Sequence, residues 1–313
     1  MIKPKALKKG DTIGIVAPAS PTFERTILIR SVKVMEGWGF KVKLGKNVNK
    51  KYGYFSGKDW ERVGDINEMF RDTKINGIFC LMGGYGSLRL LPYLDYEAIK
   101  KNPKVFVGYS DITALHLAIY KKCGVVTFHG PSLAGFSTMT DYTKKYLLKA
   151  IMKNKAIGEV DASPDDPWIW TITPGKIEGE LVGGNLSMIT ATLGTPYEID
   201  TKDKILFLEE VDVEPYHFDQ MMTHLLLAGK LHQAKGIVIG ECIRCVPADF
   251  QPGYYSSLSI EDVLVEIIKP LNIPAIYNLP FGHGENRATL PMGVKAVLDA
   301  TKGKLIIKEK ATI

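Results

Sequence analysis

Through the first half of the chain, short apolar runs alternate with stretches in which apolar residues recur every three or four positions. Such runs are typical of buried strands, and the longer spacing is typical of one face of a helix. The pattern predicts, in order, a strand at 12–16, a helix at 25–38, a strand at 41–44, a helix at 60–71, a strand at 77–81, a helix from about 87, a strand at 105–107 followed by a helix, a strand at 125–128 and a helix at 142–152. This alternation favours an α/β fold with a parallel, flavodoxin-like sheet and flanking helices.

The second half has a different pattern, in which strands cluster near the end of the chain. It predicts helices at 186–193, 218–228 and 260–268, and strands at 205–209, 236–240, 275–280, 294–298 and 305–307. We therefore expect a mixed, β-rich second domain. A length of 313 residues also favours two domains. The polar stretch 153–168 predicts the linker, which places one domain at 1–152 and the other at 169–313.

Charge and hydropathy argue against a nucleic-acid-binding, membrane-spanning or secreted protein. The formal net charge is +6, but Lys and Arg are scattered and no nucleic-acid-binding signature occurs, so we expect no nucleic-acid partner. No apolar run approaches the ~18 residues that span a membrane. The first apolar segment, Ile13 to Ala19, contains Pro18 and is too short for a secretory signal. These features predict a cytoplasmic protein without a membrane partner.

The cysteines do not form a disulfide framework. Cys242 and Cys245 make a lone C-x-x-C pair, whereas zinc would need a second pair and Cys80 and Cys123 are isolated. A redox pair would open a helix, but Pro247 follows closely. We therefore expect reduced thiols and no metal.

Ser110 lies where the strand at 105–107 passes into a helix. A hydroxyl on such a sharp turn stands clear of the sheet beside backbone N–H groups, as in hydrolases with a serine nucleophile. Serine is also a favoured helix N-cap, so the segment alone leaves both interpretations open.

A serine nucleophile needs a base, usually a histidine that a carboxylate orients. Of the six histidines, His283 is the best candidate, because the flanking Gly282 and Gly284 let a loop place the side chain at an unusual angle. The carboxylate candidates are Glu209 and Glu210, which end an apolar strand. A carboxylate there is costly unless it is paired or functional. The competing interpretations are an ordinary loop histidine and a solvated strand end.

A glycine-rich turn, Gly83–Gly86, follows a strand and precedes a helix. Its N–H groups could face an anion, and the N–H of Asp111 could act with them as an oxyanion hole. A phosphate site is the competing interpretation. That match is weak, because Arg89 stands where the dinucleotide fingerprint has its third glycine and no Walker lysine is present.

Together these features resemble the LD-carboxypeptidase family, the murein tetrapeptide carboxypeptidase and microcin-immunity group. The resemblance covers nearly the whole chain through motifs at 14–20, 83–86, 108–113, 128–131, 179–187, 206–210 and 280–284. It implies Ser110 as the nucleophile, Glu209 as the orienting carboxylate and His283 as the base. Met82 departs from the family pattern, because many members have Arg at this position.

The resemblance implies a serine carboxypeptidase that needs no cofactor or metal. Its substrate would be a muropeptide, and its reaction would hydrolyse the L,D-peptide bond that releases terminal D-Ala from a murein tetrapeptide in peptidoglycan recycling. Backbone N–H groups of Gly84 and Asp111 would bind the oxyanion, and the protein would be a homodimer. Arg287 is a candidate for the substrate's terminal carboxylate, unless it is a solvated loop arginine.

Three other functions stay open on the sequence. A microcin-immunity-type enzyme would use the same triad on an amide of a peptidyl-nucleotide. A nucleotide- or phosphate-binding protein would use the Gly83–Gly86 turn. A recycling protein could bind muropeptides without cleaving them.

Overall fold

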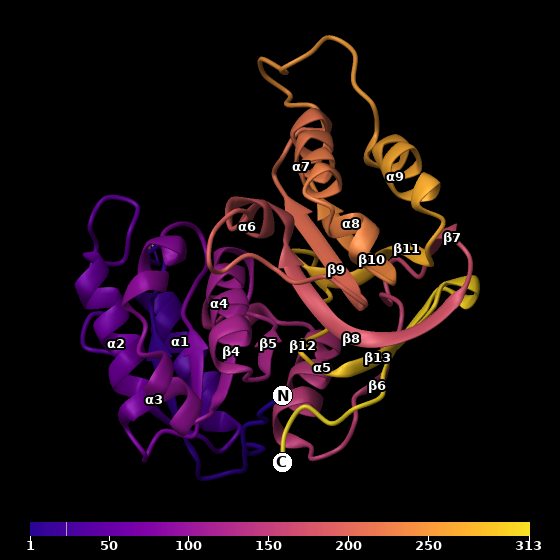
Figure 1. Ribbon diagram of the computed structural model, residues 1–313. Coiled ribbons are helices and arrows are strands. Elements are labelled where there is room, and N and C mark those ends of the chain that lie inside the picture. The colour runs from indigo at the N-terminus through magenta and orange to yellow at the C-terminus, as the bar shows by residue number, and fades with distance from the viewer. Residues whose placement is uncertain (23) are drawn as a thin grey trace.

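A computed structural model describes residues 1–22 and 24–313. Two sheets form the molecule, and Figure 1 shows the first with its helices on the left and the second on the right. The first half contributes β1 (Thr12–Val16), α1 (Arg25–Gly37), β2 (Lys41–Leu44), α2 (Asp59–Arg71), β3 (Gly77–Cys80), α3 (Tyr96–Lys101), β4 (Val105–Gly108), α4 (Thr113–Cys123), β5 (Thr127–His129) and α5 (Asp141–Met152).

The first sheet has the strand order β12-β5-β4-β3-β1-β2, and its strands are parallel except for β12 (Leu290–Met292). The order 2-1-3-4-5 is that of flavodoxin-like folds, so the predicted fold class is confirmed. Side chains alternate between two apolar layers: Val105 and Val107 of β4 join the layer of α1 and α5, and Phe106 joins that of α2, α3 and α4. Burial on both faces explains the continuous apolar run.

The second sheet is mixed, as predicted. It has eight strands in the order β6-β14-β13-β8-β9-β10-β11-β7. Helices α7 and α9 stand beside it at the top of Figure 1. Its elements are β6 (Gly158–Glu159), β7 (Trp170–Thr173), β8 (Lys176–Asn185), α6 (Leu186–Ala191), β9 (Lys204–Val211), α7 (Pro215–Leu227), α8 (Lys230–Gln233), β10 (Gly236–Ile243), α9 (Ile260–Ile268), β11 (Ala275–Gly282), β13 (Lys295–Asp299) and β14 (Lys304–Ile307).

Two segments differ in detail from the expectation. The helix expected from about residue 87 is a 3-10 helix over Ser87–Tyr93, and a separate helix, α3, begins at Tyr96, where the Asp95 side chain caps it. The polar stretch expected to be only a linker contains β6, which pairs with β14. Because this pairing uses backbone groups, no apolar pattern in the sequence predicts it.

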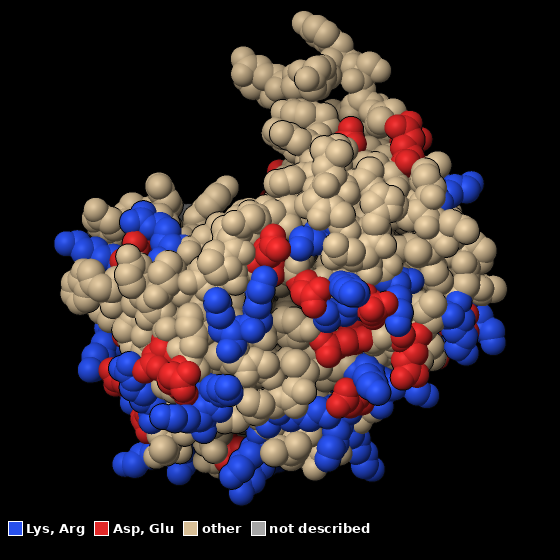
Figure 2. Space-filling model, viewed as in Figure 1, with Lys and Arg blue, Asp and Glu red and all other residues tan. Residues whose placement is uncertain are grey.

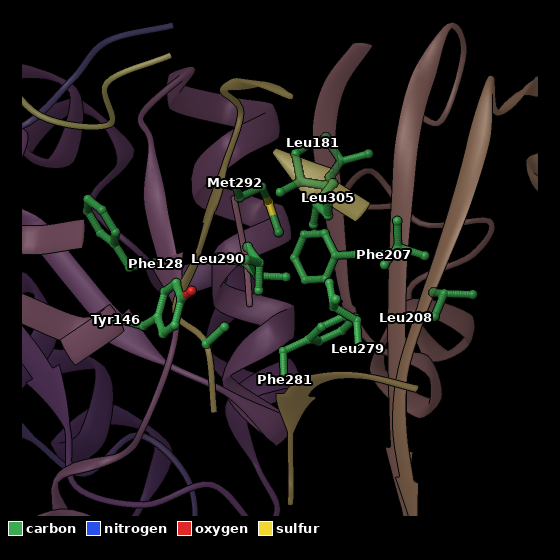
Figure 3. Packing of buried hydrophobic residues seen from close by; sticks show 14 of the residues in the cluster. Phe128, Tyr146, Leu181, Phe207, Leu208, Leu279, Phe281, Leu290, Met292 and Leu305 are labelled. Atoms are coloured by element: carbon green, nitrogen blue, oxygen red, sulfur yellow. The ribbon is translucent and has the colours of Figure 1, made fainter. Parts of the chain in front are cut away.

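The two sheets share one apolar cluster. Strand β12 comes from the late part of the chain yet pairs with β5 of the first sheet, with Leu290 opposite His129. Figure 3 shows Leu290 and Met292 beside Phe207 and Phe281 of the second sheet, and all four belong to one buried cluster. The expected domain limits therefore stay a prediction.

Charges are interspersed on the face in Figure 2, where Lys and Arg lie among Asp and Glu and the projecting top is mostly uncharged. Across the described part of the chain, no helix is both long and apolar enough to cross a bilayer. The four cysteines are free thiols.

Candidate active site

Ser110 has a backbone conformation that is rare for serine. Its φ is 63°, in the left-handed region, and it opens a 3-10 turn that leads into α4. The residues that precede the 3-10 turn and α4 are Tyr109 and Ile112, and neither helix has a side-chain cap bond. The structure therefore does not support Ser110 as a simple N-cap. A strained serine after a buried strand is the geometry of a nucleophile elbow.

The glycine-rich turn packs against this serine. A Cβ on Gly83 would lie 2.9 Å from the Cβ of Ser110, so the close approach requires glycine. Gly84 adopts a φ of +101°. The turn is thus at the position where it could offer N–H groups to a group bound at Ser110.

Buried polar contacts fix the loops around Ser110. The Arg62 guanidinium donates to the carbonyl oxygens of Pro18 and Gly86 and pairs with Asp59. The Asp111 carboxylate accepts from the N–H of Ser87, 2.9 Å away, and burial raises the pKa of this carboxyl. The Asp111 side chain therefore ties the glycine-rich turn to the nucleophile turn.

Glu209 and His283 form a direct pair. The Nδ1 of His283 lies 2.6 Å from Oε2 of Glu209, and the Glu209 side chain is fully buried. Burial alone would raise the pKa of Glu209, but His283 and then His129 lower it to about 2, so the group is an anion at neutral pH. A Cβ on Gly282 would lie 2.6 Å from Oε2, which explains the glycine before the histidine.

Strand β10 separates the strands that carry this pair, and its shape lets them meet. The register between β10 and both neighbours shifts near Gly240. A Cβ on Gly240 would collide with Phe281, so β11 approaches closely at this point. The irregular strand end thereby leaves room for Glu209 of β9 to contact His283 beyond β11.

Tyr109 brings the nucleophile and the histidine to one place. Its ring centroid is 4.8 Å from that of His283, and it directly precedes Ser110 in the chain. The structure thus gathers Ser110, Glu209, His283 and the Gly83–Gly86 turn at the junction of the two sheets.

Glu210 has a structural role instead. Its carboxylate accepts from the Asn185 side chain at 3.0 Å and from the N–H of Ser187 at 2.8 Å, which anchors the start of α6. The N–H of Asn185 donates to the Thr113 hydroxyl at 3.0 Å, so this network reaches the nucleophile helix.

Sequence reasoning missed two residues beside the pair. His129 ends β5, and its Nε2 lies 3.7 Å from Oε1 of Glu209; both atoms are buried and have no hydrogen-bond partner among the described residues. The family motif at 128–131, which contains His129, was the sequence signal that could have identified it. Glu241 of β10 lies under the loop that carries His283, and nothing in the sequence pattern marked it.

Two family models match the chain: an LD-carboxypeptidase N-terminal domain over residues 13–130 and an LD-carboxypeptidase C-terminal domain over residues 178–298. The chain belongs to the LD-carboxypeptidase family. The resemblance drawn from its motifs is confirmed. Both matched ranges contain members of the gathered site.

Relatives within the LD-carboxypeptidase family come from both of its branches. The chain is 41% identical to a probable murein peptide carboxypeptidase of Bacillus subtilis (strain 168), over 98% of this chain and 94% of the relative. It is 30% identical to the microcin C7 self-immunity protein MccF of Escherichia coli, over 97% and 95%. The structure of an MccF-like protein from Bacillus anthracis str. Ames superposes with a TM-score of 0.89 at 32% identity, covering 99% of this chain and 100% of that one. Membership of this LD-carboxypeptidase family indicates a peptidase.

Proposed function

We propose that the protein is a serine-type LD-carboxypeptidase that releases terminal D-Ala from murein tetrapeptides. The observation that carries the proposal is the buried Glu209–His283 pair beside a serine with a left-handed backbone. The murein peptide carboxypeptidase among the relatives supports the substrate class.

In this mechanism, the Ser110 hydroxyl attacks the carbonyl before D-Ala while His283 accepts its proton. Glu209 holds the Nδ1 side of the imidazole and stabilises the imidazolium that forms. The N–H groups of Gly84 and Asp111 bind the oxyanion. His283 then protonates the departing amine of D-Ala, and water hydrolyses the acyl-enzyme with His283 as base.

The direct test is mass spectrometry of a murein tetrapeptide incubated with the protein. We expect the loss of one D-Ala, and we expect Ser110→Ala and His283→Ala each to lower kcat by at least about a thousandfold. Ser110→Ala should melt cooperatively near the wild-type temperature, because its removal opens no large cavity. His283→Ala should also fold but melt lower, because it leaves the buried Glu209 carboxylate without its partner. Near-normal turnover by either variant would exclude the triad.

A second candidate has a specific observation behind it. Similarity to the microcin C7 self-immunity protein supports an amidase that cleaves peptidyl-nucleotides with the same three residues. A side-by-side assay of both substrates at equal enzyme concentration separates the two functions. The more similar murein peptide carboxypeptidase favours the peptide substrate.

Phosphate binding and muropeptide binding without cleavage have less support. The Gly83–Gly86 turn packs on Ser110, which favours an oxyanion hole over a phosphate site. A binding protein without turnover would not need a strained serine beside a histidine–carboxylate pair. A cytoplasmic location and a homodimer belong to the proposal, and gel filtration with light scattering tests the dimer.

A further inference from the structure

Two cysteines outside the proposed active site share one cavity. Cys242 is the last residue but one of β10, and Cys245 follows it by three positions. In an extended strand, residues three apart point to opposite faces. Arg244 interrupts the strand with a left-handed φ of 54°, and both cysteines line the same cavity of about 360 Å³. The turn thus brings the two free thiols to one side of the strand end.

This cavity lies where helices α7 and α9 begin. Its wall contains Pro215 at the start of α7, Ile260 at the start of α9 and Tyr277 of β11. A cavity of this volume admits a small organic molecule. Because Cys245 is only 4% exposed, a reagent reaches its sulfur through the cavity and not from the open surface.

The two thiols differ in acidity. The Cys242 thiol donates to the Cys245 sulfur and lowers the pKa of Cys245, and the N–H of Val213 acts in the same direction, against burial and nearby carboxylates. In helix-based redox pairs the N–H groups of the helix start have this effect. No helix begins at this pair, but the segment after β9 provides an N–H in its place. Cys245 is therefore the thiol that ionises first.

The other two cysteines provide a comparison within the same chain. Cys123 is 4% exposed, as Cys245 is, but burial raises its pKa to about 11. Cys80 of β3 is completely buried, and burial raises its pKa as well. Exposure alone therefore does not distinguish Cys245 from Cys123, whereas the acidity of the thiol does.

We propose that Cys242 and Cys245 are a reversible modification site for low-molecular-weight disulfides, with glutathione disulfide as the probe. The Cys245 thiolate attacks one sulfur of the reagent, breaks its S–S bond and releases one glutathione. Cys242 then attacks the Cys245 sulfur of the mixed disulfide and displaces the second glutathione. Two protein thiols are oxidised to one disulfide, one glutathione disulfide is reduced to two thiols, and these carry away the two protons.

A metal ion is the other ligand class that a thiol pair could take. A structural zinc site needs four protein ligands. Over residues 1–22 and 24–313, no group of three or more His, Cys, Asp or Glu side chains could hold a metal ion. Two adjacent thiols without further ligands favour disulfide exchange.

The test exposes the folded wild type to glutathione buffers of increasingly oxidising composition. The reagent is removed in acid, the free thiols are alkylated in denaturant, and mass spectrometry counts them. The reduced protein should be alkylated at all four cysteines. After oxidation we expect two alkyl groups fewer and a loss of two hydrogens at Cys242 and Cys245, and dithiothreitol should restore all four thiols. Cys245 should react at least about tenfold faster than Cys123.

Two variants separate the roles of the thiols. Cys242→Ser keeps the attacking thiol but lacks the second one, so we expect it to retain one glutathione on Cys245. Cys245→Ser should react at least about tenfold more slowly than the wild type, because the acidic thiol is gone. Circular dichroism checks that both variants fold. The wild-type measurement needs no variant, so it decides the proposal even if a buried serine unfolds the chain.

Four free thiols in the wild type at every buffer composition would overturn the proposal. A glutathione adduct that persists on wild-type Cys245 would also overturn it, because Cys242 would then fail to displace it. Equal reaction of Cys123 and Cys245 would mean that the whole fold opens, and would exclude a specific site. None of these measurements reads D-Ala release, so their outcome is independent of the proposed peptidase function.

Discussion

Ser110 shows at the scale of one residue what a pattern can and cannot reveal. Its position after a buried strand predicted a functional serine, and the family motifs predicted Glu209 and His283 as partners. Its left-handed backbone was not predictable, because serine has no strong preference for that region and the usual second glycine of an elbow is absent. The Glu209–His283 bond was not predictable from local pattern either, since it joins segments distant in the chain.

The contact between His129 and Glu209 leads to a prediction at the same scale. His129→Phe keeps an aromatic ring beside Phe207, whose ring centroid lies 5.5 Å from that of His129, but removes the ring nitrogen Nε2, which lies 3.7 Å from Oε1 of Glu209. Closing this gap by roughly 0.5 Å would form a hydrogen bond that steadies the carboxylate. We therefore expect kcat to fall about tenfold or more with KM unchanged. Steady-state kinetics measures this, and a variant with wild-type kcat would contradict it.

At the scale of elements, sequence periodicity recovered most of the strands and helices that bury apolar side chains. Strand β4 and helix α9 are examples, and the apolar pattern of α9 predicted its observed bounds, Ile260–Ile268. It missed β7 and also β8, in which Gly179, Gly183 and Gly184 break the apolar alternation. It also missed β6 and β12, because a two-residue strand has no period and Pro291 makes Leu290–Met292 a poor strand by composition. Pairing with a neighbouring backbone creates both strands.

Helix α4 makes stability depend on pH through His116. The ring is fully buried, its Nε2 lies 2.8 Å from the carbonyl oxygen of Gly108, and burial lowers its pKa to about 3. The unfolded chain protonates this histidine below about pH 6.5 and the folded chain does not, so its contribution is complete above 6.5 and is lost as pH falls toward 3.

Urea denaturation at pH 7 and pH 4.5 measures this contribution. We expect the loss of unfolding free energy between the two values to be about 3 kcal/mol smaller in His116→Gln than in the wild type. Equal losses in the two proteins would show that His116 does not cause acid sensitivity.

At the scale of the whole molecule, the loop that carries His283 connects the two sheets. It leaves β11 of the second sheet and enters β12 of the first. Asn286 on this loop accepts from the Thr140 hydroxyl at 2.8 Å and donates to Asp165 at 2.7 Å. The loop's position thus depends on the segments before α5 and after β6.

Asn286→Ala should therefore affect activity as well as stability. We expect the free energy of unfolding to fall by about 1–3 kcal/mol, because the buried groups that Asn286 pairs with are left without a partner. We also expect kcat to fall at least about tenfold, because the loop no longer holds His283 in position. Asn67→Ala is the control. It removes an amide that donates to the carbonyl oxygen of Tyr93 at 3.0 Å, away from the loop that carries His283. This variant should lower the free energy of unfolding without lowering kcat. Denaturant unfolding measures the free energy change in both variants, and steady-state kinetics measures kcat. An unchanged kcat in Asn286→Ala would contradict the expectation.

The pairing of β12 with β5 also sets an order of events during synthesis. The first five strands of the flavodoxin-like sheet leave the ribosome early, but the strand that covers the β5 edge emerges only after nearly all the rest of the chain. Until then β5 presents free backbone groups, the kind of edge that recruits strands from other chains. The nascent protein therefore exposes an aggregation-prone edge until β12 pairs with β5. The same step fixes the loop that carries His283, so the edge is covered when the proposed active site is completed.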